Sequence, residues 1–189
     1  YYRTILSYIK NMIEELKARS LEEAIPWQTL LKEWLQRLFL VTYYSFPESS
    51  PVTFQGGTSL RLLHGGPRHS EELDFVTLEA LETIDALRPR VFEKLKALEA
   101  LADVSLEMTV QKSHSNILRW KLKWAPPRAG EKVFVRVEFA RYPAHTRELK
   151  PLGGSSGVSA GAWIVIPVET RAELLTDKIA AVAGRPYLK

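Results

Sequence analysis

Residues 54–77 have the sequence FQGGTSLRLLHGGPRHSEELDFVT, and the end of this stretch decides the fold. In a strand, Glu72 and Asp74 share one face while Leu73 and Phe75 share the other, because successive side chains alternate. Two carboxylates about 7 Å apart on one strand face repel each other. Such a pair is tolerated where the face is wet or where a cation lies between them, and Mg²⁺ suits oxygen ligands. The stretch therefore predicts a strand with either a solvated or a metal-binding face.

A glycine pair lies upstream of these carboxylates. Gly56 and Gly57 follow a predicted strand, Val52–Gln55, and Thr58 opens a predicted helix that ends at Gly65. Backbone N–H groups at such a helix N-terminus, together with the Thr58 hydroxyl, can hold a phosphate. The two carboxylates begin fifteen residues after Gly57. The combination predicts a site with phosphates on one side and the metals that bind them on the other.

A later predicted strand, Val133–Arg141, repeats the alternation. Its odd-numbered positions from Val133 to Phe139 are apolar, which leaves Arg136 and Glu138 on the opposite face. Glu138 is therefore a candidate third metal ligand on a neighbouring strand. From alternation alone, a solvated sheet face explains the three acids equally well. The glycine pair upstream favours the metal site.

The composition narrows the class of protein. The 189 residues include no cysteine, which excludes disulfides, thiolate metal sites and a cysteine nucleophile. A net charge of +4 and an isoelectric point near 9.3 favour contact with phosphates without requiring it. No signal-peptide pattern opens the chain, and the apolar run Trp34–Phe46 is too short to span a bilayer. We therefore expect a soluble, cytoplasmic protein with no membrane partner.

The rest of the chain predicts an α+β domain with a mixed sheet flanked by helices. Three segments are expected, namely N-terminal helices over 1–46, a core over 47–168 and the start of a helical region over 169–189. The chain begins with Tyr1 and ends soon after a predicted helix, so we expect further residues at both ends. Expected helices are 3–19, Trp27–Tyr44, Leu87–Leu101 and Glu169–Val182, expected further strands are Val104–Gln111, Ile117–Trp124 and Ala162–Val168, and expected loops are Pro126–Gly130 and Pro151–Gly161.

Two motifs together resemble a known family. The Gly56-Gly57-Thr58 turn with the segment 68–75, RHSEELDF, resembles the polymerase-β-like nucleotidyltransferases and, more narrowly, the AbiEii/AbiGii toxin family. The signature of that family is a GGT-type turn followed by R-x-S-x-D-L-D-F. Residues 173–181, ELLTDKIAA, are similar to its E-x-L-x-x-K-x-x-A helix, with Lys178 at the lysine. Glu72 departs from the usual aspartate, and the family's further acidic motif would lie beyond Lys189.

The resemblance implies a polymerase-β-like nucleotidyltransferase fold with a truncated C-terminal helical part. It also implies transfer of a nucleoside monophosphate from an NTP to an acceptor hydroxyl, on RNA such as tRNA or on protein, by the toxin of a toxin–antitoxin system with a cognate antitoxin. Glu72 and Asp74 would hold two Mg²⁺ ions, and Glu138 would bind the one that lowers the pKa of the attacking hydroxyl. The implied nucleotide-binding residues are Gly56, Gly57, Thr58, Arg68, Ser70 and Lys178, and Lys178 would also neutralise charge during catalysis.

Alternative functions remain open at this point. Glu72 and the missing acidic motif favour a catalytically weak member of the fold that acts as a binding module for a protein or a nucleic acid. A metal nuclease that uses the same acids is disfavoured, because Ala140 stands where E-x-K nucleases place a lysine after Glu138. The strand 117–124 carries a basic stripe that either tracks a phosphate backbone or is an ordinary solvent face, and its members are Arg119, Lys121 and Lys123.

Overall fold

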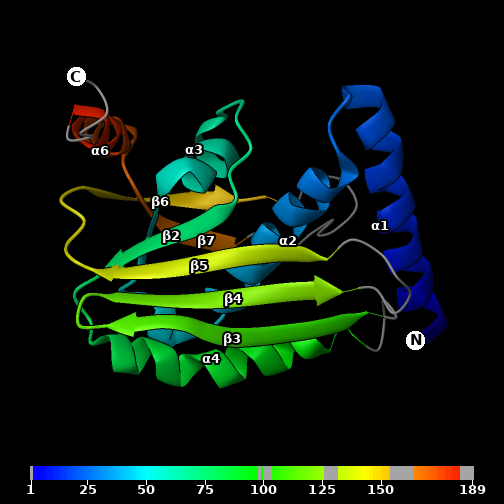
Figure 1. The fold of residues 1–189 in the computed structure, drawn as a ribbon, viewed down its shortest axis with the longest axis horizontal. Coiled ribbons are helices and arrows are strands. Elements are labelled where there is room, and N and C mark those ends of the chain that lie inside the picture. The colour runs from blue at the N-terminus through cyan, green and yellow to red at the C-terminus, as the bar shows by residue number, and fades with distance from the viewer. Residues whose placement is uncertain (1, 98, 100–103, 126–131, 154–163, 184–189) are drawn as a thin grey trace.

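The computed structural model describes residues 2–97, 99, 104–125, 132–153 and 164–183, with the side chains of 2–12 left out. Its centre is a mixed seven-stranded sheet with the order β3-β4-β5-β2-β1-β7-β6 (Figure 1). The strands are β1 Thr53–Gln55, β2 Glu72–Thr77, β3 Ser105–His114, β4 Ile117–Ala125, β5 Val133–Arg141, β6 Arg147–Leu152 and β7 Ile164–Glu169. The helices in these ranges are α1 Tyr2–Glu23, α2 Trp27–Tyr43, α3 Gly56–His64, α4 Leu81–Lys96 and α6 Arg171–Ala183, with a short 3₁₀ turn at Pro47–Ser49. The predicted α+β class is confirmed.

One face of the sheet packs on α2 and α4. Phe75 of β2 is fully buried, and its ring stacks on Phe139 of β5 with 5.0 Å between ring centres. Phe39 and Tyr43 of α2 lie against the same aromatic group, and Tyr43 is 5.5 Å from Phe139. Burying one side chain of this size contributes about 1.5–3 kcal/mol. The predicted alternation in β2 is confirmed, because the apolar half of the strand faces this core and the acidic half faces away.

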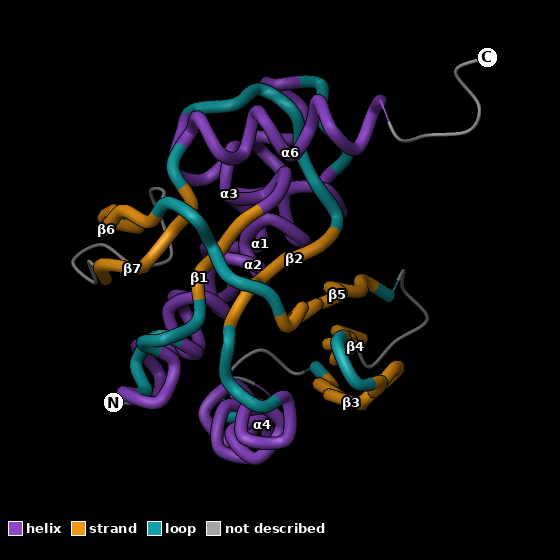
Figure 2. The backbone as a smooth tube through the Cα atoms, turned by 90° about the vertical axis from the view of Figure 1, so that its left-hand side faces the viewer, coloured by secondary structure: helices purple, strands orange, loops and turns teal. Residues whose placement is uncertain are grey.

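The helices α3 and α6 lie on the opposite side of the sheet from α4. Figure 2 shows them together beside β1 and β2, across the sheet from α4. The helix α3 begins at Gly56 directly after β1, so the expected glycine turn is the first turn of the helix. This junction points the N-terminus of α3 toward the acidic face of β2.

Two elements differ from the expectation. The helix α4 begins at Leu81, six residues before the predicted start, and it contains Pro89 in its interior. Its buried side chains recur on one face from Leu81 to Leu95, so packing on the sheet outweighs the loss of the Pro89 hydrogen bond. The strand β6 was not predicted, and Pro151 lies inside it. Proline is tolerated there because β6 is at the edge of the sheet, where one side of the strand needs no partner.

Two predicted loops lie wholly or mainly outside the described residues. Pro126–Gly130 is one of them, and the antiparallel pairing that it was expected to connect is present between β4 and β5. Of Pro151–Gly161, Pro151 and Leu152 belong to β6 and Gly153 follows them, while 154–161 are outside the description. Within the described ranges, no helix has the length and apolar character needed to cross a membrane.

Candidate active site

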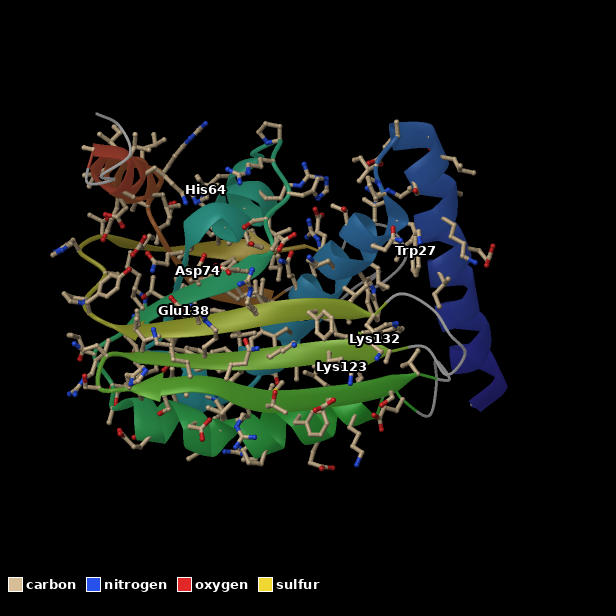
Figure 3. The ribbon with its side chains drawn as sticks, in the orientation of Figure 1. Trp27, His64, Asp74, Lys123, Lys132 and Glu138 are labelled. Carbon is tan, nitrogen blue, oxygen red and sulfur yellow. The ribbon has the colours of Figure 1, made fainter. Side chains whose placement is uncertain are left out.

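A row of charged side chains crosses three neighbouring strands on the acidic face. Asp74 of β2 is the register partner of Glu138 on the parallel strand β5. Glu138 is in turn the partner of Arg119 on the antiparallel strand β4. Figure 3 shows Asp74 and Glu138 close together on adjacent strands. The expectation that Glu138 comes from a neighbouring strand is confirmed.

Gly56 and Asp74 are in close contact at the start of α3. Gly56 has φ +80°, a conformation that favours glycine. A Cβ atom at this position would lie 2.3 Å from Oδ2 of Asp74 and 3.1 Å from its Cβ. Glycine is therefore required at position 56 both by the backbone conformation and by the space that the Asp74 carboxylate occupies.

The other two acids have arginine partners. Arg136 contacts Glu72 with 3.0 Å between Nε and Oε1. Arg119 donates from Nε to Oε2 of Glu138 at 2.8 Å. Asp74 has no hydrogen bond or ion pair with any described residue. The three acids thus share a face, and only Asp74 is without a direct cationic contact.

The surroundings of Asp74 oppose its ionisation. Burial, followed by the negative charges of Glu72 and Glu138, raises the pKa of Asp74 to about 6. Lys178 and Arg119 act in the opposite direction and offset part of this effect. A carboxylate held in such a place is one that a bound cation would stabilise.

A hollow of about 510 Å³, here called the Arg68 hollow, lies on the helical side of Asp74. Arg68 is exposed and has no ion pair with a described residue. Most of the predicted nucleotide-binding and acidic residues line this hollow, namely Gly57, Arg68, Ser70, Glu72, Asp74 and Lys178. Arg61 also lines the hollow, so three cations, a helix N-terminus and two acids meet in one space.

Thr58 is placed differently from the prediction. Its side chain is buried, and its hydroxyl donates to the backbone carbonyl of Glu72. Thr58 lines neither this hollow nor the neighbouring one described below. Its hydroxyl holds α3 against β2, which fixes the helix N-terminus beside the acids rather than contacting a ligand.

The segment that carries Arg68 and Ser70 is anchored to α2. Gln36 is buried and donates to the backbone carbonyl of Ser70 at 2.9 Å. Glu33 contacts Arg61 of α3 and His69, each at 3.0 Å. Burial acts to raise the pKa of Glu33, but the hydrogen bond from Arg61 and the nearby positive charges outweigh it, so the pKa is lowered. A charged Glu33 thus ties this segment to two helices.

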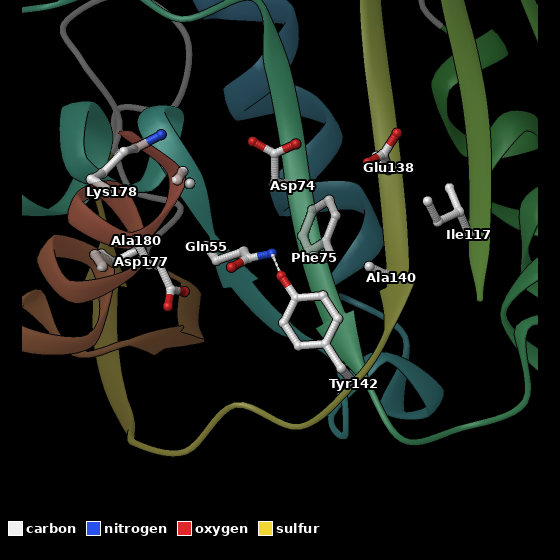
Figure 4. A pocket seen from close by; sticks show the side chains of 13 residues that line it. Gln55, Asp74, Phe75, Ile117, Glu138, Ala140, Tyr142, Asp177, Lys178 and Ala180 are labelled. Carbon is white, nitrogen blue, oxygen red and sulfur yellow. Dashed lines mark hydrogen bonds between the residues drawn. The ribbon is translucent and has the colours of Figure 1, made fainter. Parts of the chain in front are cut away.

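A second hollow of about 540 Å³, here called the Tyr142 hollow, shares Asp74 and Lys178 with the first. Figure 4 shows Lys178 and Asp177 on one side of it and Glu138 and Ile117 on the other. The Gln55 amide and the Tyr142 hydroxyl are hydrogen-bonded at 2.7 Å across its floor. Gln55, Tyr142 and Asp177 were not among the residues predicted from the sequence. The positions of Gln55 beside Gly56 and of Asp177 beside Lys178 were the available signals.

Glu169, at the end of β7, is a fourth acid near this hollow, and unlike the other three it is fully buried. With the Gln55 amide turned so that its oxygen accepts from Tyr142, its nitrogen donates to both Glu169 oxygens, at 3.1 and 3.2 Å. Burial, followed by the charges of Glu173 and Asp177, raises the pKa of Glu169 to about 8. Glu169 is therefore largely protonated at neutral pH.

Replacing Glu169 by glutamine should stabilise the fold at high pH. The folded pKa of about 8 lies above the ordinary value of 4.5, so stability from this group is complete below pH 4.5 and is lost as the pH rises through 8. Glutamine cannot ionise and avoids this loss. Urea unfolding at pH 4.5 and pH 9 should show similar free energies at the lower pH and a higher value for E169Q at the upper. A gain that is equal at both pH values would contradict the assignment.

The three acids have the chemistry that a hard divalent cation prefers, but their side chains are not gathered around one point. Oxygen donors from Glu72, Asp74 and Glu138 are of the type that Mg²⁺ prefers. In the described part of the chain, no three acidic or histidine side chains are gathered closely enough to hold a metal ion. Glu72 and Glu138 would join Asp74 on a metal only by turning away from Arg136 and Arg119. Metal binding and these two ion pairs are therefore in competition.

Comparisons with known proteins identify the family of the chain and agree with its fold. The family model described as "Nucleotidyl transferase AbiEii toxin, Type IV TA system" matches residues 39–189. In fold, the chain is similar to JHP933 from Helicobacter pylori, with a TM-score of 0.55 and 20% identity over 82% of this chain and 57% of that one. It is also similar to a candidate nucleotidyltransferase from H. pylori, with a TM-score of 0.54 and 19% identity over 80% of this chain and 58% of that one. The chain thus spans less than two thirds of either solved structure. No curated protein matches it in sequence.

Proposed function

Because the chain belongs to the AbiEii nucleotidyl transferase toxin family, we propose that it transfers a nucleoside monophosphate from an NTP to an acceptor hydroxyl. The observation that carries this proposal is the pair of hollows that meet at Asp74 and Lys178. The Arg68 hollow offers cations and a helix N-terminus to a triphosphate. The Tyr142 hollow offers space on the other side of the same carboxylate for a second reactant.

In the proposed reaction the acceptor oxygen forms a bond to the α-phosphorus of the NTP. The bond from that phosphorus to the β-phosphate oxygen breaks, pyrophosphate leaves, and the hydroxyl proton passes to solvent. Two Mg²⁺ ions, when bound, would supply charge neutralisation and lower the pKa of the attacking hydroxyl. Glu72, Asp74 and Glu138 would hold them.

The remaining side chains orient the triphosphate. Backbone N–H groups of Gly56 and Gly57 at the start of α3 and the guanidinium of Arg68 bind phosphate oxygens. Ser70 lines the Arg68 hollow with Gly57 and Arg68, while Gly56 lines the Tyr142 hollow. Lys178 faces Asp74 from α6 and neutralises charge that the metals leave exposed. These roles follow the family resemblance residue by residue, except for Thr58. Its hydroxyl holds α3 against β2 by donating to the backbone carbonyl of Glu72.

The partners follow from the same proposal. The family is described as the toxin of a type IV toxin–antitoxin system, so a cognate antitoxin is the expected protein partner. The substrates are an NTP and an acceptor such as tRNA, and a reaction that consumes NTP and requires Mg²⁺ is expected in the cytoplasm.

A second candidate function is a nucleotidyltransferase fold that binds without turnover. The specific observation in its favour is that Glu72 and Glu138 are engaged by arginines. Glu72 also carries one more methylene than the aspartate usual in the family, which shifts its carboxylate by about one bond length. If Arg136 and Arg119 keep these acids, the site binds phosphates without assembling a metal centre.

Label transfer separates the two functions. The protein is incubated with Mg²⁺, total tRNA or a protein extract, and each of the four NTPs labelled either at the α- or at the γ-phosphate. Label that moves only from the α-position, and that EDTA and Asp74→Asn abolish, supports the transferase. Absence of transfer from every NTP to either acceptor supports the binding module, and shortened RNA without label supports a nuclease.

A further inference from the structure

A third hollow, of about 650 Å³, lies on the outer face of β4 and β5, away from Lys178 and Tyr142. We call it the basic hollow. It is lined by four cations, one carboxylate and one aromatic ring, and the residues that matter here are Lys32, Glu71, Lys121, Lys132, Phe134 and Arg136. The family resemblance assigns no role to this space.

The positive charge of the basic hollow is only partly neutralised. Glu71 is shared between Lys32, at 3.3 Å, and Arg136, at 3.6 Å. Lys121 and Lys132 form no ion pair with any described residue. Four cations against one acid leave an excess of three positive charges, and Arg136 contacts one further carboxylate, Glu72. The hollow therefore favours a ligand with several negative charges.

The predicted basic stripe on β4 contributes one residue to this hollow. Arg119 is bound to Glu138, and Lys123 contacts Glu107 at 2.9 Å. Lys121, between them on the strand, lies instead over the ring of Phe134, 4.1 Å from its centre. Phe134 is only partly buried, and its neighbours Lys121 and Arg136 on the same sheet face are charged. An aromatic ring beside unpaired lysines is typical of surfaces that stack a base and hold its phosphate.

The basic hollow adjoins the active site. Arg136 lines the hollow, while its register partner Glu72 on β2 lines the Arg68 hollow. Lys132 directly precedes β5, and Glu138 lies toward the other end of this strand (Figure 3). Phe134 and Glu138 are four residues apart on one strand face, a distance of roughly 13 Å. A nucleic-acid strand bound along this face of β5 would bring its end within reach of the acidic side chains of the active site.

We propose that the basic hollow binds a single-stranded segment of the nucleic acid that accepts the nucleotide, with phosphates on Lys132 and on Lys121, whose ammonium then leaves the ring of Phe134 so that a base stacks there. This inference rests on the proposed transferase function and assigns its acceptor to RNA rather than to protein. Charge alone would also suit an acidic peptide. The aromatic ring between the lysines favours a nucleic acid, because it offers a stacking surface that a row of carboxylates does not use.

Binding without turnover tests this proposal. A fluorescein-labelled 12-nucleotide RNA of mixed sequence is titrated with protein in EDTA, without NTP, at 50 and 200 mM NaCl, and anisotropy is recorded. Lys121→Ala/Lys132→Ala should weaken binding at least about tenfold at the lower salt. It should also reduce the slope of log K against log salt by roughly 1.4, since each phosphate contact contributes about 0.7 for single strands. Phe134→Leu should weaken binding roughly fivefold or more while changing the salt slope little.

The matched control removes the same charge elsewhere. Lys17→Ala/Lys96→Ala changes exposed lysines on α1 and α4 and should bind RNA as the unchanged protein does. Equal binding by the two double variants would overturn the proposal, as would RNA affinity too weak to measure at 50 mM NaCl. Equally tight binding of a poly-glutamate of the same charge, with the same dependence on Lys121 and Phe134, would assign the hollow to an acidic protein instead. RNA binding that persists in Asp74→Asn without label transfer would leave this inference standing even if the transferase proposal fails.

Discussion

Replacing Asp74 by asparagine is expected to abolish nucleotide transfer and, at the same time, to stabilise the fold. Asparagine keeps the size of the side chain and removes the charge that would hold a metal ion. Loss of a metal ligand removes several kcal/mol of transition-state stabilisation, which corresponds to about three orders of magnitude in rate. We therefore expect transfer by Asp74→Asn to fall at least about 1,000-fold, measured as incorporation of α-labelled NTP.

The stabilising effect should depend on pH. The pKa of Asp74 is about 6 in the fold and 3.8 ordinarily, so the stability that this carboxyl contributes is complete below pH 3.8 and is lost as the pH rises through 6. Asp74→Asn should match the unchanged protein at pH 4 and exceed it at pH 8 by on the order of 2–3 kcal/mol. Urea unfolding in EDTA measures both values. A variant that is less stable than the unchanged protein at pH 8 would show that favourable contacts stabilise the charged Asp74. The repulsion by Glu72 and Glu138 would then not dominate.

Replacing Gly56 by alanine is expected to inactivate the protein by moving Asp74. The new methyl group would lie 2.3 Å from Oδ2 of Asp74, and the short aspartate side chain can relieve this contact only by turning its carboxylate away. Displacement of a reacting group by about 1 Å lowers rates by about 100-fold. We expect a loss of that size in label transfer, together with a loss of stability of about 1–2 kcal/mol from the left-handed backbone conformation.

Gly65 provides the matched control for this substitution. It has φ +72° at the end of α3, close to the φ of Gly56, but a Cβ there would meet nothing within 4 Å. Gly65→Ala should therefore lose similar stability and keep its activity. Comparable activity in the two variants, each measured well below its melting temperature, would contradict the role assigned to the contact between Gly56 and Asp74.

Much of this site could be predicted because strand alternation is a local property. Leu73 and Phe75 fixed which face of β2 is buried, and Glu72 and Asp74 then had to share the other. The same reasoning placed Glu138 on the corresponding face of β5. Gly56 followed from its position between a strand and a helix, although the reason for glycine, the space taken by Asp74, lies eighteen residues away in the sequence.

The ion pairs of the site could not be predicted, because they depend on which strands are neighbours. The pairing of Arg119 with Glu138 requires β4 beside β5, and the pairing of Arg136 with Glu72 requires β5 beside β2. Alternation within one strand contains neither fact. The Thr58 hydroxyl was expected to face a ligand, but it donates to the backbone carbonyl of Glu72. The motif could not predict this bond, because packing sets the distance from α3 to that backbone. Pro89 and Pro151 obscured α4 and β6 because proline usually ends such elements, and packing or an edge position overrode that tendency here.

The attachment of α6 has a consequence for how nucleotide affinity arises. This helix carries Lys178, yet Leu174 is its only buried residue between Arg171 and Ala183, while Leu175 and Ile179 are exposed. A helix with so few buried contacts opens at a lower free energy than the sheet beneath it, so its amides should exchange hydrogen faster than those of β2 and β5. In its proposed role Lys178 would bind a triphosphate only from the closed helix, so the apparent dissociation constant would equal the intrinsic one divided by the closed fraction. Binding of a triphosphate should accordingly slow hydrogen exchange along α6.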